Sequence, residues 1–128
     1  MHQAHGTFSV KMAPLSPAFT DGIARYSIDK ELHGDIEATS KGEMISAGNP
    51  KSGSAGYVAI EVITGTVGGK QGSFALQHSS SMDAGVPTMD IKVVPGSGTG
   101  ELKGIAGTFV IRIESGQHFY DFDYTLPG

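Results

Sequence analysis

The sequence predicts an all-β protein of one domain over residues 1–128, an eight-stranded antiparallel meander that closes into a barrel. Three observations favour this fold. Apolar residues recur at every second position in about eight segments, turns rich in glycine or proline separate the segments, and none shows the 3.6-residue period of a helix. Closing eight strands removes exposed edges and can leave space for one small ligand. A two-sheet sandwich is the alternative architecture.

Three strands are predicted before residue 48. Residues 7–12 and 23–32 alternate apolar with polar side chains, and a loop with prolines and a glycine, residues 14–22, separates them. After a turn at Gly34, residues 36–47 place small side chains and one methionine on the same face. Small residues in a strand indicate that another segment of the chain packs close to it.

The strongest β segment spans residues 57–67 and follows a polar loop over residues 48–56. Both of its faces carry apolar side chains, with Val58, Ile60 and Val62 on one and Tyr57, Ala59 and Ile63 on the other. A strand that is apolar on both faces is typical of burial on both sides. The sequence therefore predicts a subunit contact on this strand, and a homo-oligomer.

The second half of the chain contains the remaining four strands. The pair Gly68-Gly69 predicts a hairpin into residues 71–82. A turn and a short strand over residues 89–93 follow, and Ser115-Gly116 predicts the last hairpin, between residues 109–113 and 118–126.

A glycine-dense segment over residues 93–109 connects two of these strands. It contains five glycines, at positions 96, 98, 100, 104 and 107. The spacing matches neither the dinucleotide-binding pattern G-x-G-x-x-G nor the P-loop pattern, and no helical segment follows to point its dipole at a phosphate. We interpret the glycines as a structural turn near the seam of the barrel.

Composition limits the partners. The formal net charge is −4 and no cluster of Lys or Arg is present, so we expect no nucleic-acid partner. There is no cysteine, which excludes disulfides and thiolate chemistry. The N-terminus lacks the pattern of a signal peptide and no segment is apolar over a membrane-spanning length, so we expect a cytoplasmic protein without a membrane partner. No histidines sit at a local metal-binding spacing, and no metal or other cofactor is predicted.

Four strings of residues resemble a bacterial family known as domain of unknown function 3224. They lie at residues 34–44, 72–79, 94–102 and 120–127 and together extend over nearly the whole chain. That family is grouped with allene oxide cyclase-like barrels, and the glycine pattern of residues 98–108 is similar to the glycine-rich turn of cyclase and dirigent barrels. The resemblance implies an eight-stranded, oligomeric barrel and no established activity. A shared fold does not carry a shared reaction.

Glu61 and His78 are the candidate catalytic residues. A carboxylate inside a barrel is desolvated, which raises its pKa and suits general acid or base work near neutral pH. Alternation equally allows Glu61 to face water while Val58 and Ile60 face the core. A hairpin symmetric about Gly68-Gly69 places Glu61 and His78 on one face at diagonal positions, and a shift of one residue separates them.

Candidate ligand-binding residues are Met44, Gln77, Tyr120 and Tyr124, the two tyrosines sharing one face of the last strand. The tyrosines are equally interpreted as core aromatics. The sequence favours a barrel that binds a small apolar or amphipathic molecule in its lumen. Two alternatives remain: an isomerase or cyclase that moves a proton with Glu61 or His78, and a filled barrel that acts as a structural module.

Overall fold

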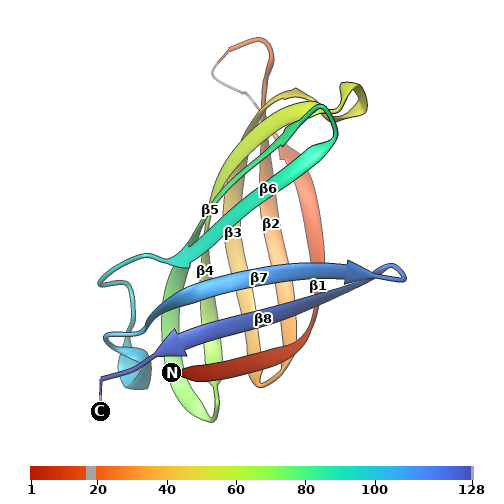
Figure 1. Cartoon of the computed structure of the whole chain (residues 1–128). Helices are drawn as coiled ribbons and strands as arrows, with labels where there is room; N and C mark the ends of the chain where they lie inside the picture. The colour runs from red at the N-terminus through yellow and green to blue at the C-terminus, as the bar shows by residue number, and fades with distance from the viewer. Residues whose placement is uncertain (17–19, 128) are drawn as a thin grey trace.

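The protein folds into a closed barrel in which each strand pairs with the next along the chain and the last pairs with the first (Figure 1). This computed structural model describes residues 1–16 and 20–127. The strands are β1 (His2–Leu15), β2 (Ile23–Gly34), β3 (Ile36–Asn49), β4 (Ser54–Val67), β5 (Lys70–Asp83), β6 (Val86–Val93), β7 (Ala106–Glu114) and β8 (Gln117–Thr125). All neighbouring pairs are antiparallel. The predicted meander barrel is confirmed, and the sandwich is not formed.

Several strands are longer than the sequence predicted. The loop expected over residues 48–56 is mostly strand, because the pairs Gly48↔Ala55 and Asn49↔Ser54 extend the β3–β4 ladder as far as the short 3-10 turn η1 (Pro50–Ser52). Small side chains there leave the ladder unobstructed. Of the loop expected over residues 14–22, the first two residues belong to β1, and residues 17–19 lie outside the described residues.

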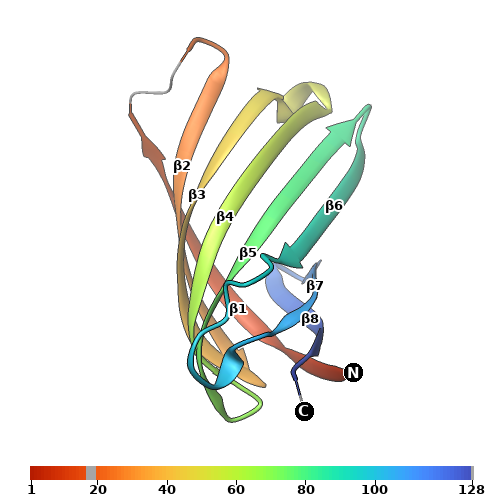
Figure 2. The same ribbon diagram turned by 90° about the vertical axis from the view of Figure 1, so that its left-hand side faces the viewer.

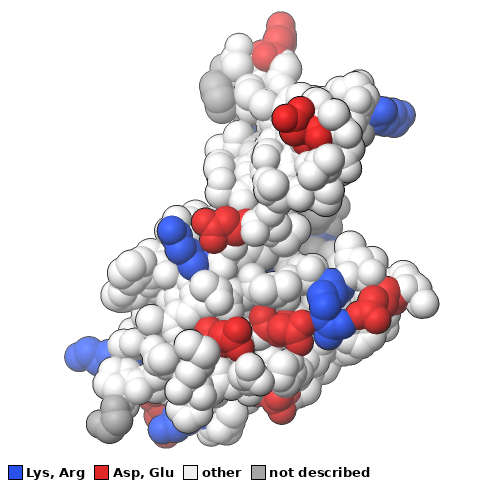
Figure 3. Space-filling model, in the orientation of Figure 1, with Lys and Arg blue, Asp and Glu red and all other residues white. Residues whose placement is uncertain are grey.

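The N-terminus is also ordered into the barrel. Strand β1 pairs with β8 from His2 onward. The ring Nδ1 of His5 lies 2.7 Å from Oδ1 of Asp121. In Figure 3, acidic and basic side chains form a row on the outer surface over β7 and β8, where Arg112 forms ion pairs with Asp121 and Glu114. Arg112 therefore lies outside the barrel, as the alternation predicted.

Aromatic and aliphatic side chains fill the half of the barrel that ends at the β2–β3 and β4–β5 turns, which we call the closed half. Phe122 is completely buried and stacks against Phe74 and Tyr124, with ring centroids 5.6 and 5.0 Å apart. The glycine-rich loop closes this end by inserting Leu102 and Ile105, which are 1% and 2% exposed. A strand follows that loop instead of a helix, as the structural interpretation of its glycines requires.

The opposite half, which ends at the β1–β2, β3–β4 and β5–β6 hairpins, is closed on fewer sides, and we call it the open half. Strands β7 and β8 cross only the lower part of the barrel, while β1 to β6 extend beyond them (Figure 2). Strand β8 pairs with β1 only as far as Phe8, and β6 pairs with β7 only through Lys92↔Thr108. The upper parts of β1 and β6 therefore border an opening in the side of the barrel.

Candidate functional site

Four polar side chains from four adjacent strands meet inside the barrel, between the two halves. They are Lys30 on β2, Ser40 on β3, Glu61 on β4 and His78 on β5, and we call them the polar cluster. Lys30 pairs with Ser40 across β2–β3, which places them in one row. Strands β4 and β5 have the register predicted from the symmetric hairpin, with Glu61 opposite Leu76 and Ala59 opposite His78. Glu61 and His78 consequently share the inner face.

Glu61 is the centre of the polar cluster and is 1% exposed. Its Oε1 accepts a hydrogen bond from Ser40 Oγ at 2.7 Å. Its Oε2 accepts one from Lys30 Nζ at 2.8 Å and lies 2.5 Å from His78 Nε2. Both oxygens are thus engaged, which is how a carboxylate is retained in a protein interior.

The pKa of Glu61 moves in the direction opposite to our expectation. Burial raises it, but the hydrogen bond from His78, the positive charge and hydrogen bond of Lys30 and the hydrogen bond from Ser40 together outweigh burial and lower the pKa to about 2. Glu61 is therefore an ionised acceptor at neutral pH. The expectation of a raised pKa considered desolvation and omitted the partners, so a general acid at Glu61 is not what this geometry provides.

The ionised Glu61 fixes the orientation of His78. Because the carboxylate only accepts hydrogen bonds, Nε2 of His78 must carry the proton in their contact. The other ring nitrogen, Nδ1, has no hydrogen-bond partner among the described residues. In this arrangement Glu61 positions the imidazole, and Nδ1 is the atom of the pair with free capacity to bind or to take up a proton.

Gly42 makes the space that Glu61 occupies. The two residues are opposite each other in the β3–β4 pairing. A Cβ placed on Gly42 would lie 2.8 Å from the Glu61 Cβ and 2.2 Å from the Ile60 carbonyl oxygen. The close approach predicted from the small residues of this strand is confirmed here.

Two adjoining cavities lie between the polar cluster and the hairpins of the open half. The inner chamber, of about 180 Å³, is bounded by Lys30 and His78 and by apolar side chains of β1, β6 and β7. The methionine pocket, of about 480 Å³, continues toward the hairpins. Its larger side chains are Met12, Met44, Met82, Met89, Tyr26 and Tyr57. Four of these residues, Met12, Met44, Tyr57 and Met89, line both cavities, so the two spaces adjoin each other.

Comparison with known proteins identifies the family of the chain. The profile of the family described as "Protein of unknown function (DUF3224)" matches residues 4–124. The chain belongs to the DUF3224 family. It is similar to a crystallised protein of unknown function from the DUF3224 family of Shewanella oneidensis MR-1, with 45% identity, a TM-score of 0.93 and coverage of 100% of this chain and 98% of that one. No curated protein matches the sequence.

Within this member of the DUF3224 family, the predicted ligand-binding residues are dispersed. Met44 lines both cavities. Gln77 lies on the outer face of β5, beside Ile60, because its parity is opposite to that of His78. Tyr120 and Tyr124 are buried in the closed half, as the core interpretation had it.

Tyr120 has a structural role in the closed half. Its hydroxyl accepts a hydrogen bond from the Ile36 N–H at 2.8 Å and donates to the His33 carbonyl oxygen at 3.0 Å. Burial raises the pKa of Tyr120 to about 12 despite the opposing hydrogen bond from Ile36. The phenol therefore stays neutral and ties β8 to the β2–β3 turn.

Lys30 was not predicted to belong to the site, although its position in the sequence indicated a buried charge. Lys30 has the same parity as Ile28 and Leu32, so it is a charged residue on the apolar face of its strand. A charge in that position predicts a buried partner. Ser40 is one of the small residues predicted to share a face of residues 36–47, and no role was predicted for it.

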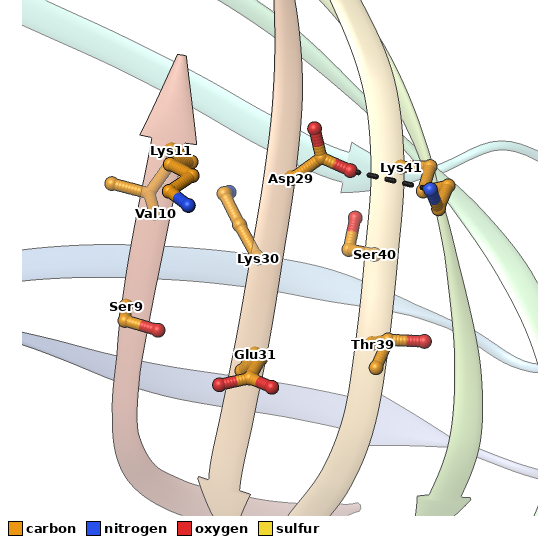
Figure 4. A pocket seen from close by; sticks show the side chains of 9 residues that line it. All are labelled: Ser9, Val10, Lys11, Asp29, Lys30, Glu31, Thr39, Ser40 and Lys41. Atoms are coloured by element: carbon orange, nitrogen blue, oxygen red, sulfur yellow. Dashed lines mark ion pairs between the residues drawn. The ribbon is translucent and has the colours of Figure 1, made fainter.

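The outer surface of β1, β2 and β3 has a shallow pocket of its own, of about 630 Å³ (Figure 4). Its exposed charges include Asp29 and Lys41, which form an ion pair at 3.5 Å. Lys30 and Ser40 border this pocket from neighbouring strands while their polar groups bind Glu61 inside. The polar cluster thus occupies the inner side of the same wall.

Within residues 1–16 and 20–127, no three His, Cys, Asp or Glu side chains are grouped so that they could hold a metal ion. No helix in the described part of the chain has both the length and the apolar character needed to cross a membrane.

Proposed function

We propose that the protein binds a small apolar or amphipathic molecule in the lumen of the open half. One observation carries this proposal: the barrel interior is filled in one half, whereas the other holds two adjoining cavities with mainly apolar walls, the inner of which is bordered by Lys30 and His78. The methionine pocket alone, at about 480 Å³, has the size of pockets that hold small organic ligands. Methionine side chains adapt to irregular apolar shapes, which suits such a cavity.

The opening in the barrel wall supplies a route of entry. Met12, Met89 and Ile113 border the inner chamber from β1, β6 and β7. They are 47%, 50% and 65% exposed, although their parity directs them inward. The filled-barrel alternative applies to the closed half only. The isomerase alternative has His78 as its remaining support, because Glu61 is ionised and fully engaged.

The test blocks the methionine pocket with a large side chain and uses the same substitution on the outer face of the barrel as a control. Ala55 of β4 lines the methionine pocket, and Ala47 of β3 is exposed outside. The uncharged apolar dye N-phenyl-1-naphthylamine is titrated against the wild type, Ala55→Phe and Ala47→Phe. We expect fluorescence enhancement with the wild type and Ala47→Phe and at least tenfold weaker binding to Ala55→Phe. Absence of binding to the wild type, or equal binding by both variants, contradicts the proposal.

A further inference from the structure

Two groups of the polar cluster have binding capacity that the protein itself does not use. Nδ1 of His78 has no partner among the described residues, yet no described side-chain nitrogen or oxygen is both buried and unpartnered. Nδ1 therefore keeps some accessible surface, and His78 lines the inner chamber as well as a pocket of the outer surface. Lys30 Nζ has three N–H groups, donates one to Glu61 and lies over the Phe8 ring, 5.0 Å from its centre, which leaves hydrogen-bonding capacity for an acceptor. Lys30 lines the inner chamber too.

The charges of the polar cluster determine which polar group of a ligand can bind to it. The Lys30 ammonium and the Glu61 carboxylate cancel, so the cluster is neutral when His78 is neutral. The chamber then contains one acceptor, Nδ1, and one cationic donor, Nζ. A carboxylic acid matches both, because its O–H donates to Nδ1 and its other oxygen accepts from Nζ. An alcohol satisfies Nδ1 without pairing Lys30, and an alkylammonium adds a second cation beside it.

We propose that the ligand is a monocarboxylic acid with a linear apolar tail, whose head binds His78 and Lys30 and whose tail extends along the methionine pocket. This inference rests on the proposed function. An acid that is ionised in solution arrives as a carboxylate, and burying it without a counter-charge is costly. Binding therefore takes up one proton from solvent onto Nδ1, and the resulting imidazolium donates to the carboxylate while Glu61 accepts from Nε2.

Other titratable groups near His78 are few. Glu61 of β4 binds it directly, and Lys30 of β2 lies on the same carboxylate oxygen. Tyr57 of β4 and His118 of β8 line the inner chamber, and β6 contributes the apolar Met89. The ring of His118 packs against Phe8, with centroids 5.1 Å apart. His118 is the other imidazole that lines the chamber, which makes His118→Gln the matched control.

The experiment is isothermal titration calorimetry at pH 7.5 with decanoic acid, decanol and decylamine, each in phosphate and in Tris. For the wild type we expect the acid to bind at least tenfold more tightly than the alcohol and the amine to bind most weakly. The difference in heat between buffers should correspond to about one proton taken up per acid. That stoichiometry makes the Kd of the acid rise about tenfold from pH 7.5 to 8.5.

His78→Gln removes the proton-accepting nitrogen and keeps an amide donor for Glu61. We expect it to abolish proton uptake and the preference for the acid. Decanol binding should stay within twofold, because the amide oxygen of the glutamine can accept from the alcohol in place of Nδ1. His118→Gln is expected to retain both proton uptake and the preference for the acid. If His78→Gln does not fold, the double variant Lys30→Met/Glu61→Gln removes both charges together and is expected to weaken acid binding at least tenfold without affecting decanol.

The outcomes separate this inference from the function on which it rests. Equal binding of acid and alcohol to the wild type, acid binding without proton uptake, or an unchanged acid preference in His78→Gln overturns the head-group assignment. The pocket then still binds apolar molecules. If none of the three compounds binds the wild type, the proposed function fails as well.

Discussion

The two halves of this barrel are built from the same strands with the same alternation, yet one is solid and the other hollow. In the closed half the inward positions carry large aromatic residues such as Phe74 and Phe122, and the strands enclose them together with the glycine-rich loop, which is hydrogen-bonded to β5. In the open half they carry methionines and small residues such as Ala55, and β7 and β8 no longer complete the wall. Alternation specifies the barrel, whereas side-chain size and strand placement decide where it is filled.

The first prediction compares large-to-small substitutions in the two halves. Phe122→Ala leaves a cavity among Phe74, Phe109 and Tyr124, and we expect it to lower the free energy of unfolding by about 3–5 kcal/mol. Met82→Ala lies at the methionine pocket, which is already open, and is expected to cost less than about 1 kcal/mol. Urea unfolding of both variants measures the difference. Equal losses would mean that the open half is packed like the closed one.

The second prediction concerns the polar cluster at the boundary between the halves. The pKa of Glu61 is about 2 in the folded protein against an ordinary value of 4.5. A lowered pKa stabilises the fold above the ordinary value, and that stabilisation is lost as the pH falls from about 4.5 to about 2. A shift of this size corresponds to about 3 kcal/mol.

Urea unfolding at pH 5.5 and at pH 2.5 tests this, with Glu61→Gln as the comparison. The wild type is expected to lose about 3 kcal/mol more than the variant between the two pH values, because the neutral amide has no charge to titrate. Parallel pH profiles of the two proteins would show that Glu61 is not held ionised by His78 and Lys30.

The third prediction removes one hydroxyl from each half. Tyr120→Phe leaves the buried Ile36 N–H without its acceptor, and we expect a loss of about 1–2 kcal/mol. Tyr57 faces the cavities and its hydroxyl has no hydrogen bond with the residues that the structure describes. Tyr57→Phe is therefore expected to change stability by no more than about 0.5 kcal/mol. Thermal unfolding of both variants beside the wild type measures the two losses of stability. A loss for Tyr57→Phe that equals or exceeds that for Tyr120→Phe would contradict this prediction.

The sequence predicted the fold well because the barrel depends on local signals. The alternation of residues 57–67 and the pair Gly68-Gly69 specify a hairpin with its register, and that register brought Glu61 and His78 to the same face. The site was less predictable. Lys30 and Ser40 reach Glu61 from strands 31 and 21 residues away, and their effect on its pKa depends on distances that no sequence pattern encodes.

The location of the hollow was also beyond the sequence. Tyr120 and Met44 both occupy inward positions, and alternation cannot tell which lies where the wall is complete. That depends on how far β7 and β8 extend across the barrel. Two tyrosines were therefore assigned to the ligand when they belong to the core.

The last prediction concerns an apolar strip on the outer surface of the barrel. It is formed by Ile45, Val58, Ile60 and Val62, which are 37–56% exposed. The alternative that Val58, Ile60 and Val62 face the core is thus wrong, and the subunit contact expected on this strand remains a prediction. A second copy is the partner we expect. Lys41 and Glu43, which form ion pairs with Asp29 and Arg25 in the same chain, border the strip with opposite charges, and an antiparallel copy can bring each near the other.

Light scattering of the wild type at micromolar concentration tests this, with Ile60→Lys as the disrupting variant. A lysine in the middle of an apolar contact is strongly unfavourable, so we expect a dimer or larger assembly to become a monomer. Thr64→Lys, exposed on the same face of β4 beyond the strip, is the control and is expected to keep the assembly. Because position 60 faces solvent within one subunit, the stability of the monomer should change by less than about 0.5 kcal/mol. A monomeric wild type would contradict the predicted subunit contact, because the strip would then be exposed apolar surface. The two halves of the barrel would in that case differ only in their interior.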